Sequence, residues 1–314
     1  MSAARLAWAL ALLASVPVGP GPAHSAPAHG SATLSVWHAN GWHAWWRAER
    51  GPSRWVAPDS TLARALTWRR LAPGLEWASV RLACAGPAWR TRLIVARLDP
   101  RQVALSLEMD LAREDRRPAW SIDRAPDGAL LAVNAGQFVG AMPWGWVVID
   151  GWQRLRPGFG PLSSAIAVDA LGDVRWVHGD TLAAWGGVVA GFQSYPTLLC
   201  GDGVVPAALR TGAGGVNLSH RDARLALGET RDGRLLIAMT RFDAMGEVAG
   251  GVPIGPTTPE MAAIMGALGA CDAVMLDGGI SAQLLMRDPT RGATLRWSGL
   301  RKVPLALIVR SRSR

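Results

Sequence analysis

The stretch GPTTPEMAAIMGALGACDAVMLDGGIS, from Gly255 to Ser281, carries the clearest structural pattern in this chain of 314 residues. Thr257 can act as a helix N-cap with Glu260 at the third helical position, or Thr258 can cap the helix with a proline at its first position. Apolar side chains then recur at the spacing of one helix face as far as Gly269, a residue type that ends helices. The pattern predicts one capped helix.

A short strand and a carboxylate follow this helix. Residues 273–276 are apolar and too few for a second helix, so we expect an inner β-strand. Asp277 stands at the end of that strand, beside backbone left accessible by Gly278 and Gly279. A charge next to an apolar strand costs free energy unless it has a partner or a chemical task. Asp277 is therefore a candidate catalytic carboxylate, with capping of the glycine turn as the structural alternative.

Outside this stretch the sequence predicts mainly β-structure. The clearest hairpin pairs Arg224–Glu229 with Arg234–Phe242 through a tight turn at Asp232 and Gly233. Many antiparallel strands with one clear helix predict an α+β fold, with a mixed, mainly antiparallel β-sheet and few helices in a single domain. The other expected strands are 76–83, 92–98, 103–109, 129–134, 146–150, 164–168, 174–177 and 303–309.

The two ends of the chain have different compositions. Residues 1–25 predict a signal peptide, because Arg5 precedes an apolar run and Ala23 and Ser25 suit a cleavage site. We therefore expect a periplasmic or secreted protein with no stable membrane insertion after cleavage. Residues 26–70 are rich in tryptophan and without clear periodicity. We expect them to pack on the main domain, expected over 71–310, with a sugar-stacking platform as the alternative; 311–314 form a basic tail.

The formal net charge of +9 favours anionic ligands. All cationic side chains except Lys302 are arginines, which pair well with phosphates. No dense basic run with interleaved aromatic residues occurs, so we expect no nucleic-acid partner.

Cysteine and acidic residues give no metal or cofactor signature. The chain has three cysteines, and the sequence does not choose among the three pairings that one disulfide could take: Cys84, Cys200 and Cys271. The acidic loop 169–173 lacks the spacing of an EF-hand, and turn formation explains it. We predict no cofactor. Calcium stays an open alternative, because oxygen ligands from Asp and Asn leave no spacing signature in this sequence.

A set of segments occurs in order along the chain: Leu71–Trp77, Ala132–Gly136, Arg224–Gly228 with Asp232–Gly233, Gly255–Gly269 and Leu276–Ser281. Together these segments resemble the phosphodiester glycosidase family. The resemblance covers about residues 71 to 310, and two positions depart from the usual pattern of the family. Ile280 replaces the third glycine of an Asp-Gly-Gly-Gly-Ser motif, and Ala135 is inserted between Asn134 and Gly136. A β-branched residue at position 280 would be strained if that position required a positive φ.

The resemblance implies hydrolysis of a sugar–phosphate bond and gives roles to particular residues. Asp277 would stabilise positive charge at the sugar or activate water, and Glu260 would be the second carboxylate, with a capping box as its structural alternative. Arg224 would hold the phosphate, with an ion pair to Asp222 or Asp243 as its alternative. The implied substrate-binding residues are Asn134, Gly136, Thr257, Gly278, Gly279 and Ser281. His220 is a candidate proton shuttle, with a solvated loop histidine as the alternative.

The sequence therefore predicts an exported hydrolase that cleaves the sugar-side C–O bond of a sugar-1-phosphodiester. Its substrate would be an anionic glycan or another sugar phosphate, such as a glycolipid. Two alternatives stay open. One is a non-catalytic polysaccharide-binding protein of the cell envelope with the same fold. The other is a phosphodiesterase that cuts the P–O bond.

Overall fold

The computed structural model describes residues 33–84, 90–178, 182, 186–213, 216–242 and 254–312. The predicted signal peptide, Asp243 and the last two residues of the predicted basic tail lie outside these ranges.

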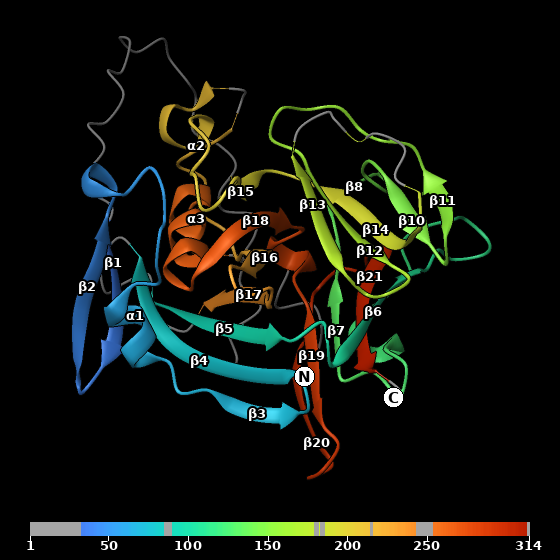
Figure 1. Cartoon of the computed structure of the whole chain (residues 1–314), viewed down its shortest axis with the longest axis horizontal. Coiled ribbons are helices and arrows are strands. Elements are labelled where there is room, and N and C mark those ends of the chain that lie inside the picture. The colour runs from blue at the N-terminus through green and yellow to red at the C-terminus, as the bar shows by residue number, and fades with distance from the viewer. Residues whose placement is uncertain are drawn as a thin grey trace, which may run out of the picture. The chain divides into compact units, whose positions relative to one another are not determined.

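The largest sheet has nine strands, all paired antiparallel (Figure 1). They are β1 (Thr33–His38), β2 (Gly41–Arg47), β3 (Arg69–Ala72), β4 (Leu75–Cys84), β5 (Arg90–Leu98), β15 (Thr197–Leu199), β16 (Leu225–Thr230), β17 (Leu235–Phe242) and β18 (Ala270–Leu276). Their order is β15-β18-β16-β17-β5-β4-β1-β2, with β3 paired to β4. The predicted hairpin is confirmed as β16 and β17, and β16 also pairs with β18 on its other side.

Two smaller sheets of five strands each are also antiparallel. The first has the order β11-β10-β14-β12-β13 and contains β10 (Val147–Ile149), β11 (Trp152–Leu155), β12 (Ser164–Asp169), β13 (Val174–His178) and β14 (Val188–Ser194). The second has the order β20-β19-β7-β21-β6 and contains β6 (Val103–Met109), β7 (Leu131–Asn134), β19 (Leu284–Asp288), β20 (Ala293–Trp297) and β21 (Leu305–Ser311). A separate pair consists of β8 (Phe138–Val139) and β9 (Met142–Pro143).

One hydrophobic core joins the three large sheets. It contains Ile237 of β17, Ile166 of β12 and Leu307 of β21, all nearly inaccessible to solvent. Alternate residues of each of these strands face this shared core, while the residues between them pack into separate apolar clusters on the other faces of the sheets. The ends of β7, β16 and β18 meet at the margin of this core, where polar residues replace apolar ones.

The helix α3 (Thr258–Ala267) covers the other face of the nine-stranded sheet. Of the two N-caps that the sequence allowed, the structure has Thr257, whose hydroxyl accepts the Glu260 N–H at 3.3 Å while the Glu260 carboxylate accepts the Thr257 N–H at 2.8 Å. Gly269 follows the helix with a φ of +97°, as expected for a helix end. Nearly every residue of α3 is buried. Both faces of the helix are covered, because further elements pack on the side that points away from the sheet.

The tryptophan-rich segment supplies much of that packing. It forms β1, β2, the short helix α1 (Ser60–Ala65) and β3, although the sequence showed no periodicity there. The ring of Trp55 lies so close to Gly266 of α3 that a Cβ at Gly266 would overlap it. Another short helix, α2 (Ala208–Thr211), also contacts α3. Trp55 is buried, so it has the packing role that the sequence predicted for this segment.

Two further expectations concern cysteines and membranes. The structure has all three cysteines as free thiols, so the disulfide that their number allowed is not formed. Burial raises the pKa of the Cys271 thiol to about 12, which makes it a poor nucleophile at neutral pH.

In the described part of the chain, no helix is long and apolar enough to span a membrane.

Candidate functional site

Asp277 lies directly after β18, and neighbouring strand ends fix its backbone. Its N–H donates to the carbonyl of Gly136 at 3.0 Å, and its carbonyl accepts the Asn134 side-chain amide at 2.8 Å. The other end of the same amide, Oδ1, accepts the backbone N–H of Gln283 at 3.0 Å. Asn134 is buried, so its two polar atoms serve the backbone of this loop. The structure thus gives the predicted sugar-binding residue Asn134 a positioning contact with Asp277.

Gly136 has the backbone conformation that its motif requires. Its φ is +66°, and a Cβ there would lie 3.3 Å from the carbonyl oxygen of Gln193. The inserted Ala135 is buried beside it. The insertion therefore leaves the contact between Gly136 and Asp277 intact.

The glycine turn after Asp277 is tightly packed. The Gly279 N–H donates to the carbonyl of Ala223 at 2.7 Å, and a Cβ on Gly278 would overlap that same carbonyl oxygen. Positive φ occurs at Gly279, with +57°, and not at Ile280. Ile280 is 41% exposed in an ordinary backbone conformation, so it causes none of the strain that a third-glycine position could have implied.

Ser281 and Arg301 hold the Asp277 side chain. Arg301 donates to the Asp277 carboxylate at 3.2 Å and to the Ser281 hydroxyl at 2.9 Å. The guanidinium also lies over the ring of Phe138, with 4.5 Å between its central carbon and the ring centroid. Asp277 keeps 16% of its side chain exposed, whereas Ser281 is buried. The carboxylate is therefore oriented and still open to a ligand.

Asp222 is a second carboxyl group at this site. Its Oδ2 lies 2.8 Å from the position that a Cβ would take on Gly279, so the carboxylate rests against the glycine turn. His220 Nε2 lies 3.6 Å from the same oxygen, and the Ala223 N–H donates to Oδ1 at 2.8 Å. The residue stands just before β16, which runs beside β18. The order of strands thus brings Asp222 to the loop of Asp277.

Both carboxyl groups hold protons more tightly than usual. Burial raises the pKa of Asp277, and the negative charge of Asp222 raises it further against the opposing effects of Ser281 and Arg301. Burial also raises the pKa of Asp222, although Arg224 and His220 act in the opposite direction. Two interacting carboxyl groups with raised pKa values are typical of acid–base sites.

Arg224 is a cation near Asp222. Its Nε donates to the carbonyl of Pro256 at 2.9 Å, and its Nη2 donates to the carbonyl of His220 at 2.6 Å. These backbone contacts hold the guanidinium in place, and its charge lowers the pKa of Asp222. Burial lowers the pKa of Arg224 itself, but a guanidinium remains charged in proteins. The structure thus places both Asp277 and the predicted phosphate ligand Arg224 close enough to Asp222 to affect its charge or be affected by it.

A cavity of about 500 Å³ adjoins Arg224. Gln137 connects its wall to the strand end of Asp277, because the side-chain amide donates to the carbonyls of Tyr195 and Leu276, each at 3.1 Å. The cavity is lined by Trp144, Phe159, Gly160, Pro161, Leu162, Ser163, Tyr195, Pro196, Val216, Asn217, His220, Arg224 and Thr258.

Glu260 and Thr257 do not reach this cavity with their polar groups. The Glu260 carboxylate is fully buried, caps α3 and accepts two hydrogen bonds from Arg221 at 2.8 and 2.9 Å. The Thr257 hydroxyl serves the same capping box. The structure therefore favours the capping alternative for Glu260, because all the bonds described for its carboxylate are to protein groups.

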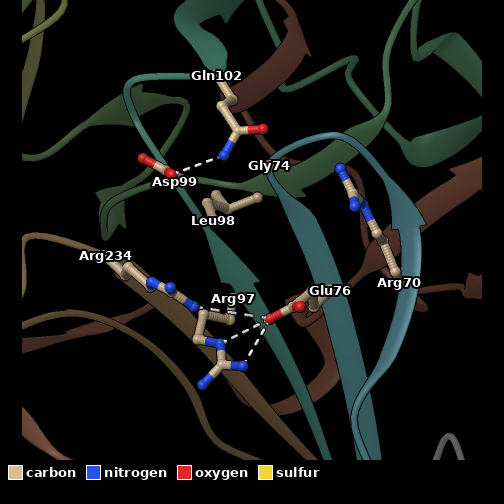
Figure 2. Close-up of a pocket in the computed structure, with 8 residues that line it drawn as sticks. All are labelled: Arg70, Gly74, Glu76, Arg97, Leu98, Asp99, Gln102 and Arg234. Atoms are coloured by element: carbon tan, nitrogen blue, oxygen red, sulfur yellow. Dashed lines mark hydrogen bonds and ion pairs between the residues drawn. The ribbon is translucent and has the colours of Figure 1, made fainter.

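Another polar hollow, of about 160 Å³, lies on the nine-stranded sheet. Figure 2 shows Arg97 and Arg234 directed at Glu76, and Gln102 bonded to Asp99. Its two carboxylates are thus already paired with neighbouring side chains, so this hollow is a weaker candidate for a site.

Among the described residues, no group of three or more His, Cys, Asp or Glu side chains is arranged to hold a metal ion.

The sequence of residues 127–310 matches the family model described as phosphodiester glycosidase. The chain belongs to the phosphodiester glycosidase family. Membership of this family indicates a glycosidase-type activity on phosphodiesters, and the matched region includes Asp277, Asp222, Arg224 and Arg301. A comparison with curated proteins finds no match.

Two solved structures show the same fold as this chain. One is the catalytic domain of zebrafish N-acetylglucosamine-1-phosphodiester alpha-N-acetylglucosaminidase, auto-inhibited by its pro-peptide, with a TM-score of 0.55 and 16% identity over 79% of this chain and 87% of that one. The other is a Burkholderia pseudomallei K96243 protein described as a candidate exported protein, with a TM-score of 0.56 and 14% identity over 82% of this chain and 100% of that one. At these identities the likeness concerns the fold alone.

Sequence reasoning missed two of the residues that shape the site. The sequence suggests Asp222 only as an ion-pair partner of Arg224, although it stands just before a predicted hairpin strand, as Asp277 stands just after a predicted inner strand. Arg301 lies in a loop with no periodic pattern, and only its fold position brings it to Asp277.

Proposed function

We propose that this protein is an exported hydrolase that cleaves the sugar-side C–O bond of a sugar-1-phosphodiester. The observation that carries the proposal is the group formed by Asp277 and Asp222, two partly exposed carboxyl groups with raised pKa values, flanked by Arg301 and Arg224. Family membership supports the reaction class.

Each side chain has a task in this reaction. Asp277, kept oriented by Arg301 and Ser281, faces the positive charge that develops at the anomeric carbon. The C–O bond breaks and its electron pair stays on the departing phosphate oxygen, whose charge Arg224 stabilises. Water then bonds to the anomeric carbon and gives its proton to Asp222, from which His220 at 3.6 Å can relay it to solvent.

Glu260 has a different task in this proposal. Its carboxylate is fully buried and bonded to Arg221 and to the Thr257 N–H, so it supports the start of α3 and does not touch substrate. Asp222 takes the place of the second carboxylate that the sequence assigned to Glu260.

The proposal is tested with N-acetylglucosamine-1-phosphate methyl ester and related sugar-1-phosphodiesters. We expect Asp277→Asn and Asp222→Asn each to lower kcat by at least about 100-fold, the usual contribution of a positioned acid–base group. Asp232→Asn, in the exposed turn at the far end of the β16–β17 hairpin, is the matched control and should retain full activity. Equal sugar release by wild type and Asp277→Asn across the panel would reject the proposal that the protein is a hydrolase.

Two further measurements separate the alternatives. Hydrolysis in water labelled with heavy oxygen puts the label in the sugar if the C–O bond is cut, and in the phosphate if the P–O bond is cut. Glycan binding without turnover, unchanged in Asp277→Asn, would support the polysaccharide-binding alternative. Export is tested separately: the protein recovered from the periplasm or medium should begin at Ala26.

A further inference from the structure

We infer that the cavity beside Arg224 binds the alcohol part of the substrate, and that this alcohol is an aliphatic chain. The inference rests on the proposed function, because it assumes a phosphate held between the cavity and the carboxyl groups. A substrate of this class is a sugar linked through phosphate to a lipid-like chain.

The order of groups along the site matches the order of groups in such a molecule. Arg224 and His220 line the cavity, and His220 Nε2 lies 3.6 Å from the Asp222 carboxylate. That carboxylate in turn rests against the glycine turn that follows Asp277. A phosphate at the Arg224 guanidinium therefore places its sugar at the carboxyl groups and its second ester oxygen at the cavity. Gln137 fixes this relation, because it bonds both to the cavity wall at Tyr195 and to the end of β18.

The lining of the cavity suits a chain without hydroxyl groups. Most of the wall is aromatic, aliphatic or proline, as in Trp144, Leu162 and Val216. None of the described residues that line it carries a carboxylate, the group that sugar-binding sites use to accept hydroxyl protons. The Asn217 amide oxygen already accepts hydrogen bonds from Ser219 and His220. An alcohol rich in hydroxyl groups would lose part of its hydrogen bonding to water against this largely apolar wall.

The cavity walls are held in place before any ligand arrives. The buried Gln193 side chain accepts the N–H groups of Trp146 and Gly158 at 3.1 and 2.8 Å and donates to the Gly158 carbonyl at 3.1 Å. It thereby ties together the two loops that carry Trp144 and Phe159. A preformed wall lowers the entropy cost of binding a flexible chain.

The outer edge of the cavity is also apolar. Phe159 lines the cavity and is 84% exposed. The ring of Tyr195 packs edge-on against Trp144 at 4.5 Å between centroids. Exposed aromatic residues at an edge extend the apolar contact beyond the cavity, which fits a chain that continues outward.

The test compares two esters of N-acetylglucosamine-1-phosphate that match in heavy-atom number, the decyl ester and the ester of triethylene glycol monomethyl ether. We expect kcat/KM to be roughly 50-fold higher for the decyl ester, as if about three methylene groups lost contact with water. Phe159→Ser should reduce this preference at least roughly threefold. The control Trp152→Ser removes another aromatic residue that is 71% exposed, outside the cavity, and should keep the preference.

The outcomes separate this inference from the proposed function. Sugar release from every ester without a chain preference would reject the aliphatic subsite and leave the hydrolase standing. A preference for the polyether ester would also reject it. If no ester is cleaved, the proposed function fails. The aliphatic subsite is then tested by calorimetry, which compares the binding of decyl phosphate with that of methyl phosphate. Equal binding of the two, or binding of decyl phosphate that Phe159→Ser does not weaken, overturns the subsite.

Discussion

Replacing Glu229 with glutamine is expected to stabilise the protein at alkaline pH and to leave its stability nearly unchanged in acid. Glu229 of β16 lies directly opposite Asp272 of β18, so two acidic residues face each other across one strand pair. His178 Nε2 bonds the Asp272 carboxylate at 2.7 Å, and Cys271 donates to the Glu229 carbonyl at 3.2 Å. Arg231, the nearest cation along the chain, is bonded to Asp202 instead.

The magnitude follows from the environment of the carboxyl group. Burial, and then the charge of Asp272, raises the pKa of Glu229 from 4.5 to about 7. The folded state therefore binds the proton more tightly, and stability is lost as pH rises from 4.5 through about 7. At 1.36 kcal/mol per pKa unit the loss is at most about 3.4 kcal/mol. The side chain keeps contact with water, so we expect about 1 to 2 kcal/mol.

Urea unfolding at about pH 4 and about pH 8 measures this effect. Glu229→Gln should raise the free energy of unfolding by about 1 to 2 kcal/mol at the higher pH and by less than about 0.5 kcal/mol at the lower. The exposed Glu114→Gln is the control and should change neither value by more than about 0.5 kcal/mol. An equal gain at both pH values, or no gain at pH 8, would refute a charge penalty at this strand pair.

Three other changes test the packing and the turn. Arg221→Met leaves the fully buried Glu260 without its cation and should lower the free energy of unfolding by about 3 to 5 kcal/mol, and adding Glu260→Gln should recover part of the loss. Gly266→Ala places a methyl group into the Trp55 ring and should cost about 1 to 3 kcal/mol in chemical unfolding; a full-length protein as stable as wild type would contradict the packing. Ile280→Gly should change kcat/KM by less than about twofold, because position 280 has no positive φ. A large gain in activity would contradict this and would mean that Ile280 strains the backbone.

Elements defined by local chemistry could be predicted from the sequence. The capping box of Thr257 and Glu260 and the stop at Gly269 act within a few residues, and the helix was located correctly. The hairpin around Gly233 was also located correctly, because its turn residues determine the register of the two strands.

Elements that depend on distant neighbours were missed. The central strand β14 contains Gly191, which reads as a strand breaker, yet a Cβ there would lie 2.5 Å from the Trp146 ring, so glycine is required by the neighbouring strand. A register shift between Leu34 and Ser35 disrupts the alternation of β1. At the site, Asp277 could be predicted from its strand end, whereas Asp222 and Arg301 reach it through strand order and a distant loop.

The Asn134 amide has a consequence for how activity returns after denaturation. It links β7 to the loop after β18 across 143 positions of sequence, and a second bond reaches Gln283. Loop closures of this length are slow and come after local hairpins have formed. We therefore expect refolding to regain its far-ultraviolet circular dichroism first and its catalysis last, with a collapsed early species that is rich in strands and turns over no substrate.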